Sequence, residues 1–84
     1  MYTIKQAAAR SGLSVPVVRA WERRYGVVHP ARTPSGYRLY DDAAVDRLRT
    51  MQALIARGWS PSTAAAASIA FRSDPAAYLR SFQP

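Results

Sequence analysis

The stretch from residue 14 to residue 40, SVPVVRAWERRYGVVHPARTPSGYRLY, carries the pattern on which the fold depends. Ser14 is a residue type that caps helix N-termini, and Gly26 is one at which helices commonly end. A helix is therefore expected between them. Pro16 disfavours helical angles at Val15, so we expect this helix to start one residue late and to span residues 16–25.

The two faces of this helix differ in their chemistry. At ~100° per residue, one arc is apolar and holds Val17, Val18, Trp21 and Tyr25. The opposite arc holds Pro16, Arg19, Ala20, Arg23 and Arg24, with Glu22 at its margin near Arg19. An ordinary surface helix mixes both charge signs on its polar face, whereas this arc has no acidic residue. The pattern favours a helix that packs inward on one side and enters a DNA major groove on the other.

A second short helix precedes the first one. Thr3 and Gln6 have the spacing of a capping box, and Ser11 with Gly12 would close the helix that they open. Two short helices joined by a tight turn that contains glycine form a helix-turn-helix. The preceding residues 2–4 are apolar enough to form a fragment of strand.

The helical period disappears between Gly26 and Asp41. Pro34-Ser35-Gly36 has turn chemistry, and residues 37–40 alternate and favour strand, so we predict a two-stranded hairpin, or wing. Arg38 is the residue expected to contact a phosphate or the minor groove, and Gly36 would permit close approach. Tyr40 is expected to pack against the core. The candidate contact residues of the hairpin are Arg32, Thr33, Gly36, Tyr37 and Arg38.

Three further helices are expected after the hairpin. Asp41 would cap a long helix that ends near Arg57, with Leu48 on its inner arc and Thr50 on its outer arc. Ser60-Pro61 would open an alanine-rich helix through about residue 72, and Asp74-Pro75 a last short helix over 76–82. Arg57 and the turn after it form a candidate second wing, in which Trp59 is expected to fill the core. The predicted fold is mainly α, a winged helix-turn-helix with a two-stranded hairpin and four to five helices.

Composition argues for a nucleic-acid partner and against an enzyme. The chain has 84 residues, enough for one domain, no cysteine, one histidine and five acidic residues. It therefore has no thiolate for catalysis, disulfides or metal binding, and few groups for acid–base chemistry, and no metal site is predicted. The net charge is +7, and residues 1–40 contribute +6 of it through seven basic residues against Glu22 alone. Such a lopsided basic charge favours a face for nucleic acid. The sequence contains no run of ~20 apolar residues, so no membrane span is predicted.

Several separated motifs together resemble a known family. Residues 18–26 read VRAWERRYG, and residues 30–40 read PARTPSGYRLY. In order and spacing they are similar to the MerR-type winged-helix DNA-binding domain, and most of all to its cobalamin-dependent, light-responsive CarH/CarA/LitR branch. The resemblance covers residues 2–70. It implies that the helix over 16–25 reads the major groove, that the hairpin is the first wing, and that residues 58–62 lie in the second. The family's contacts map onto Arg19, Ala20, Arg23, Tyr25, Arg32, Thr33, Tyr37 and Arg38.

The chain also departs from that family. Ala20-Trp21 stand where many relatives carry two tyrosines, so a hydroxyl contact to phosphate is missing at residue 20. The long dimerising helix, the effector domain and the cobalamin-binding histidine motif do not occur in the 84 residues. We therefore expect residues 1–72 to be the DNA-binding domain of a longer regulator and residues 73–84 to be a short helix or the start of a linker. No cofactor is expected within this chain, and cobalamin would belong to a further C-terminal domain.

The predicted function is sequence-specific binding of double-stranded promoter DNA by a bacterial transcriptional repressor in the cytoplasm, at the nucleoid, with self-association on the DNA. One alternative is a basic module that docks an acidic protein such as an antirepressor. Another is a stand-alone architectural, excisionase-like DNA-binding protein. The candidate DNA-binding residues are Pro16, Arg19, Ala20, Arg23, Arg24, Tyr25, Arg32, Thr33, Gly36, Tyr37, Arg38 and Arg57.

Overall fold

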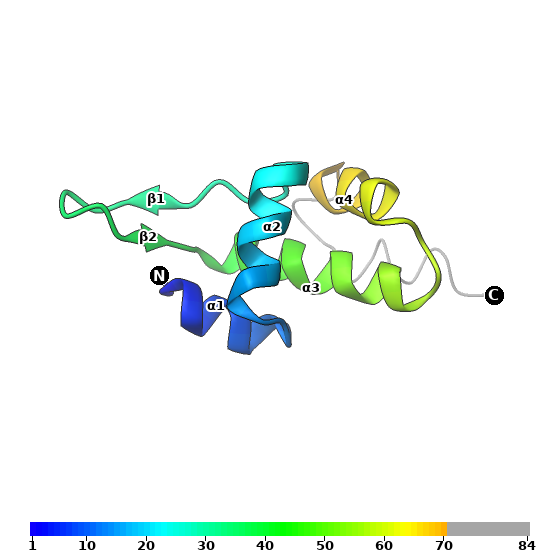
Figure 1. The fold of residues 1–84 in the computed structure, drawn as a ribbon, viewed down its shortest axis with the longest axis horizontal. Coiled ribbons are helices and arrows are strands. Elements are labelled where there is room, and N and C mark those ends of the chain that lie inside the picture. Colours follow the sequence, from blue (N-terminus) through cyan, green and yellow to red (C-terminus); the bar gives the residue numbers. More distant parts are fainter. Residues whose placement is uncertain (71–84) are drawn as a thin grey trace.

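The computed structural model describes residues 1–70, and within them it contains four helices and one two-stranded hairpin (Figure 1). The elements follow the order α1 (Ile4–Ser11), α2 (Val15–Tyr25), β1 (Ala31–Arg32), β2 (Arg38–Leu39), α3 (Asp42–Ala56) and α4 (Pro61–Ala70). The predicted fold class, a mainly helical winged helix-turn-helix, is confirmed. The expected last helix over 76–82 and the domain boundary at residue 72 lie outside the described residues.

The predicted capping box forms α1. The Thr3 hydroxyl accepts a hydrogen bond from the Gln6 backbone N–H at 3.3 Å, and the Gln6 side chain accepts one from the Thr3 N–H at 2.9 Å. Gly12 ends the helix with a φ of 71°, in the left-handed region that favours glycine. Its position lets the chain turn directly into α2, so the helix-turn-helix follows from local sequence.

The N-terminus of α2 lies one residue earlier than the sequence suggested. The Ser14 hydroxyl caps the helix by accepting from the Val17 N–H at 3.4 Å, and Val15 is already helical. Pro16 is tolerated because the first-turn N–H groups have no partner within a helix, so its missing N–H costs no helical hydrogen bond. The expected late start was therefore wrong, although the cap and the end at Gly26 are as predicted.

The predicted hairpin is present and is antiparallel. Ala31 pairs with Leu39 and Arg32 with Arg38, and the Thr33 N–H donates to the Tyr37 carbonyl at 2.9 Å beyond the last pair. The hairpin extends from the helical body toward one end of the long axis of the molecule (Figure 1). The short apolar segment at residues 2–4 contributes one bridge, in which Tyr2 and Tyr40 exchange two backbone hydrogen bonds of 2.7 and 2.8 Å. This bridge ties the N-terminus to the base of the hairpin.

The core lies around α3. Asp41 caps this helix by accepting from the Ala44 N–H at 2.8 Å. Its inner face buries Leu48, Met51 and Leu54 completely, and α1 and α4 pack on it. Thr50, which was expected on the outer arc, is buried. Its hydroxyl donates a hydrogen bond to the Asp46 carbonyl at 2.8 Å, so this buried polar group has a partner within its own helix.

Two half-buried aromatic residues complete this core. Trp21 and Trp59 both pack against it, as predicted from the sequence. None of the helices in residues 1–70 has the length and apolar character needed to cross a bilayer.

Candidate nucleic-acid interface

An open groove of about 950 Å³ separates α2 from the hairpin. From α2, Arg19, Glu22 and Arg23 line one wall. The hairpin supplies the other wall, with residues 3 and 4 at the margin. Two of these α2 residues and four hairpin residues are DNA contacts predicted from the sequence. The structure brings those six around one groove: Arg19, Arg23, Thr33, Gly36, Tyr37 and Arg38.

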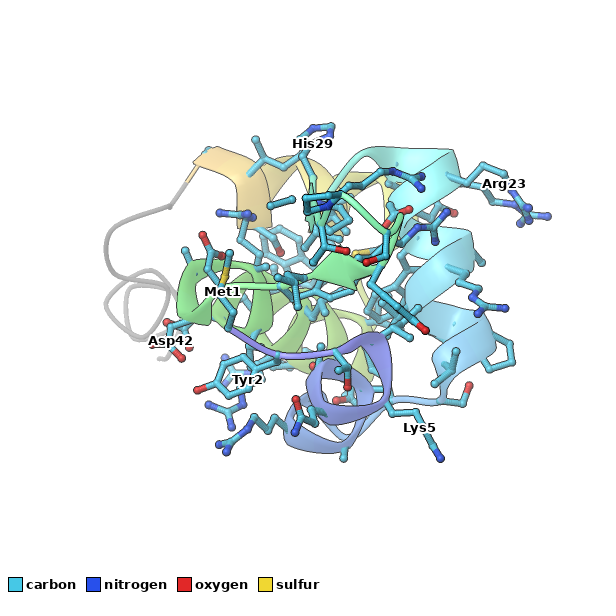
Figure 2. All side chains as sticks on the ribbon, turned by 90° about the vertical axis from the view of Figure 1, so that its left-hand side faces the viewer. Met1, Tyr2, Lys5, Arg23, His29 and Asp42 are labelled. Atoms are coloured by element: carbon cyan, nitrogen blue, oxygen red, sulfur yellow. The ribbon has the colours of Figure 1, made fainter. Side chains whose placement is uncertain are left out.

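The predicted division of α2 into two faces is seen in the burial of its side chains. Val18 is fully buried, whereas the three arginines of the opposite arc are exposed. Figure 2, which looks along the molecule from the hairpin end, shows Arg23 projecting away from the body on the side formed by α2. Tyr2 and Asp42 lie on the opposite side. The exposed residues of the arc are Pro16, Arg19, Arg23 and Arg24.

Two other predicted contact residues of α2 are less accessible. Ala20 is half-buried, and Tyr25 is half-buried with its ring against the core. Tyr25 therefore contributes packing whatever else it contacts. Neither residue lines the groove.

The tip of the hairpin is an exposed turn that is closed by two hydrogen bonds. The Gly36 N–H donates to the Thr33 carbonyl at 2.9 Å, and the Tyr37 N–H donates to the Thr33 hydroxyl at 3.1 Å. Gly36 has a φ of 88°, so a residue with a side chain would be strained in this turn. Tyr37 is 73% exposed, which is uncommon for so large an apolar ring on a small domain. The ring is thus available to a partner that reaches the hairpin.

Arg38 is already engaged within the protein. Its guanidinium lies 3.2 Å from the Glu22 carboxylate, and the Tyr40 hydroxyl donates to the other oxygen of the same carboxylate at 2.9 Å. Tyr40 is fully buried, as expected for a packing residue. Burial, together with the hydrogen bond to Glu22, raises the pKa of Tyr40 to about 12, so its hydroxyl stays a donor at neutral pH.

This cluster of Glu22, Arg38 and Tyr40 was missed from the sequence, where Glu22 was placed near Arg19. The partners lie 16 and 18 residues along the chain from Glu22, on a different element. No local spacing rule connects residues at that separation.

Arg57 lies away from the groove. It is the exposed C-terminal cap of α3, and a helix of 15 residues spans about 22 Å. The hairpin joins the other end of this helix (Figure 1). The structure therefore does not bring the candidate second wing into contact with the groove residues. Arg32 also lies outside the groove lining, but it is exposed on the hairpin beside Arg38.

The described residues hold no group of three histidine, aspartate or glutamate side chains that could bind a metal ion. The placement of cobalamin in a further domain stays a prediction.

Comparison with known proteins assigns the family. The model of the MerR HTH family regulatory proteins matches residues 2–67. This chain belongs to that family. It is 48% identical over 64 residues to the HTH-type transcriptional repressor CarH of Myxococcus xanthus, a match that covers 76% of this chain and 21% of CarH. It is 41% identical over 58 residues to the regulator MlrA of Escherichia coli, covering 69% of this chain and 24% of MlrA.

A shorter relative is matched over most of its own length. The regulator MerD of Pseudomonas fluorescens is 48% identical over 48 residues, which cover 56% of this chain and 86% of MerD. By contrast, the chain spans only about a fifth to a quarter of the length of CarH and MlrA.

Proposed function

We propose that this chain binds double-stranded DNA to regulate transcription, with α2 in the major groove and the hairpin over the neighbouring sugar-phosphate backbone. The observation that carries the proposal is the shared groove, which Arg19 and Arg23 line from one side and the hairpin from the other. One phosphate strand that borders a major groove would fit between a helix in that groove and a wing beside it.

Each exposed side chain of the interface has a chemistry that suits duplex DNA. Arg19 and Arg23 can donate two hydrogen bonds to a guanine edge or to a phosphate. Ala20 can contact a thymine methyl group. Pro16 and Arg24 are exposed on the same arc, and the Arg24 guanidinium can donate to a phosphate. Membership in the MerR family and the regulator names of the relatives support this assignment.

The finer parts of the proposal concern the whole regulator. A single module of this kind buries only ~600–1,000 Å² of protein surface on DNA, so we expect two or more copies on one operator. The chain covers only part of CarH and MlrA, which supports the view that it is the DNA-binding domain of a longer bacterial regulator. We propose that this regulator acts in the cytoplasm without catalytic activity. CarH is named a transcriptional repressor, which supports the proposal that the regulator containing this chain represses transcription.

The test compares two arginine variants that change the net charge equally. A duplex selected from a randomised pool by the wild-type chain is used to measure affinity by fluorescence anisotropy. Arg23→Ala should weaken binding roughly 5- to 150-fold and relax the preference at one base pair, because it removes a contact worth about 1–3 kcal/mol. Arg10→Ala should change affinity little, since Arg10 stacks on Tyr2, which lies on the side of the molecule opposite Arg23 (Figure 2).

Three outcomes would contradict the proposal in different ways. Equal losses in both variants would mean that net charge, not the α2 face, drives binding. Equal affinity for the selected and a scrambled duplex would indicate an architectural role. If no duplex were enriched, and the affinity of the chain for arbitrary duplex DNA did not depend on salt concentration, the alternative of an acidic protein partner would be favoured.

A further inference from the structure

Within residues 1–70, a single polar side-chain contact joins the two hairpin strands themselves, β1 and β2, to α2. That contact is the ion pair between Arg38 and Glu22, at 3.2 Å. The hairpin strands are only two residues long, and two-stranded hairpins are marginally stable on their own. The ion pair is therefore placed where it can influence the angle between the hairpin and α2.

The Glu22 carboxylate is itself held in place. Its second oxygen accepts the hydrogen bond from Tyr40, whose ring is fully buried and whose backbone is paired with Tyr2. The side chain of Glu22 is only 18% exposed and that of Arg38 is 33% exposed, so water competes little for the carboxylate. The cluster therefore connects the core, α2 and the hairpin through side-chain contacts.

The hairpin carries two arginines with different surroundings. Arg32 and Arg38 are directly opposite each other in the register, an arrangement that is unfavourable for like charges. Glu22 neutralises Arg38 and so relieves this repulsion. Arg32 is exposed, and no ion pair engages it within the described residues.

We propose that Glu22 is a positioning residue for DNA binding: through Arg38 it sets the angle of the hairpin against α2, and it leaves Arg32 as the hairpin arginine that contacts a phosphate. This inference rests on the proposed function and refines the expectation that Arg38 makes that contact. This role explains why an acidic residue, Glu22, lies within an otherwise basic interface: it orders the hairpin in the free protein, before DNA is bound.

The first arm of the test uses the free 84-residue chain. The double variant Glu22→Gln/Arg38→Gln removes the ion pair and leaves the net charge unchanged. Backbone ¹⁵N relaxation should show the hairpin amides of Thr33, Ser35, Gly36 and Tyr37 becoming more mobile, from order parameters of about 0.85 toward 0.6, while α2 is unaffected. Circular dichroism and thermal unfolding confirm that the variant is folded. Unchanged order parameters in the hairpin would overturn the proposal.

The second arm measures the salt dependence of binding to the selected duplex. Arg32→Gln should flatten the slope of log affinity against log salt by about one, because one phosphate contact is lost. The double variant should bind roughly three- to tenfold more weakly, the cost of ordering the hairpin on binding, with the slope unchanged. If instead the double variant flattened the slope and Arg32→Gln did not, Arg38 would be the phosphate contact and the proposal would be wrong.

The two arms separate this inference from the proposed function. If the wild-type chain failed to bind any duplex, the proposed function would fall and the assignment of a DNA contact to Arg32 with it. The loss of hairpin order in the double variant would still show that Glu22 positions the hairpin. If the wild-type chain bound DNA but the hairpin stayed ordered in the double variant, only the inference would fail.

Discussion

At the scale of single residues, Tyr40 has two roles, of which only core packing was predicted from the sequence. Its ring fills the core, and its hydroxyl donates to Glu22 at the base of the hairpin. A buried tyrosine hydroxyl needs a partner, because an unsatisfied polar group in the core is costly. The position of Glu22 supplies this partner and so connects core packing to the geometry of the interface.

The raised pKa of Tyr40 predicts a loss of stability at alkaline pH. In the unfolded chain Tyr40 ionises near pH 10, whereas in the folded chain its pKa is about 12. Its contribution is therefore fully present below pH 10 and is lost as the pH rises from 10 to 12. Urea unfolding at pH 8 and pH 11 should show a larger drop in the free energy of unfolding for wild type than for Tyr40→Phe. Equal drops would contradict the shift. The pKa of Tyr2 is also raised, by its hydrogen bond to Asp42, and both proteins share that contribution.

At the scale of elements, the two helices of the helix-turn-helix depend on their caps. Helix α1 has 8 residues and α2 has 11, and isolated helices of this length are only marginally stable in water. Each begins with a hydroxyl cap and ends at a left-handed glycine. The caps therefore fix where the helices start and stop, and tertiary packing supplies most of their stability, α1 against α3 and α2 against α1 and α4.

Removal of the α1 cap should destabilise the domain measurably. Thr3→Ala should lower the free energy of unfolding by about 1 kcal/mol, since the Gln6 N–H loses its acceptor. Thr3→Ser keeps the hydroxyl and is the matched control. Chemical denaturation of both variants provides the measurement, and equal stability of Thr3→Ala and wild type would contradict the role of the capping box.

At the scale of the whole molecule, one core supports every part of the interface. α3 packs against α1 and α4, and Leu48, Met51 and Leu54 fill the space between the elements. A domain of this size has a stability of about 4–13 kcal/mol, from roughly 0.05–0.15 kcal/mol per residue. The loss of one large core side chain is therefore a substantial fraction of the total.

Leu54→Ala should show this dependence. Truncation of a fully buried leucine costs about 2–5 kcal/mol, so the unfolding midpoint should fall strongly and DNA binding should decrease with the folded fraction. Ile55→Ala removes a neighbouring side chain that is only half-buried and should cost clearly less. Similar losses for the two variants would mean that the core is not centred on Leu54.

Local patterns were sufficient to predict most of the elements and the orientation of α2. The capping box at Thr3, the cap at Ser14, the turn at Gly36 and the cap at Asp41 all involve partners three or four residues apart. Such contacts form whenever the segment folds, so spacing alone reveals them. The two arcs of α2 follow in the same way from the helical period, and the MerR family follows from motifs in fixed order.

Contacts between distant segments could be recognised only once the elements were packed. The pairing of Glu22 with Arg38 and Tyr40, the burial of Thr50, and the separation of Arg57 from the groove all depend on how α2, α3 and the hairpin meet. The periodicity of one element specifies which side chains share a face, but it does not specify what lies opposite that face. That choice is made by the packing of the whole domain, which brings Arg19 and Arg23 of α2 and Arg38 of the hairpin to one groove, together with the acidic Glu22.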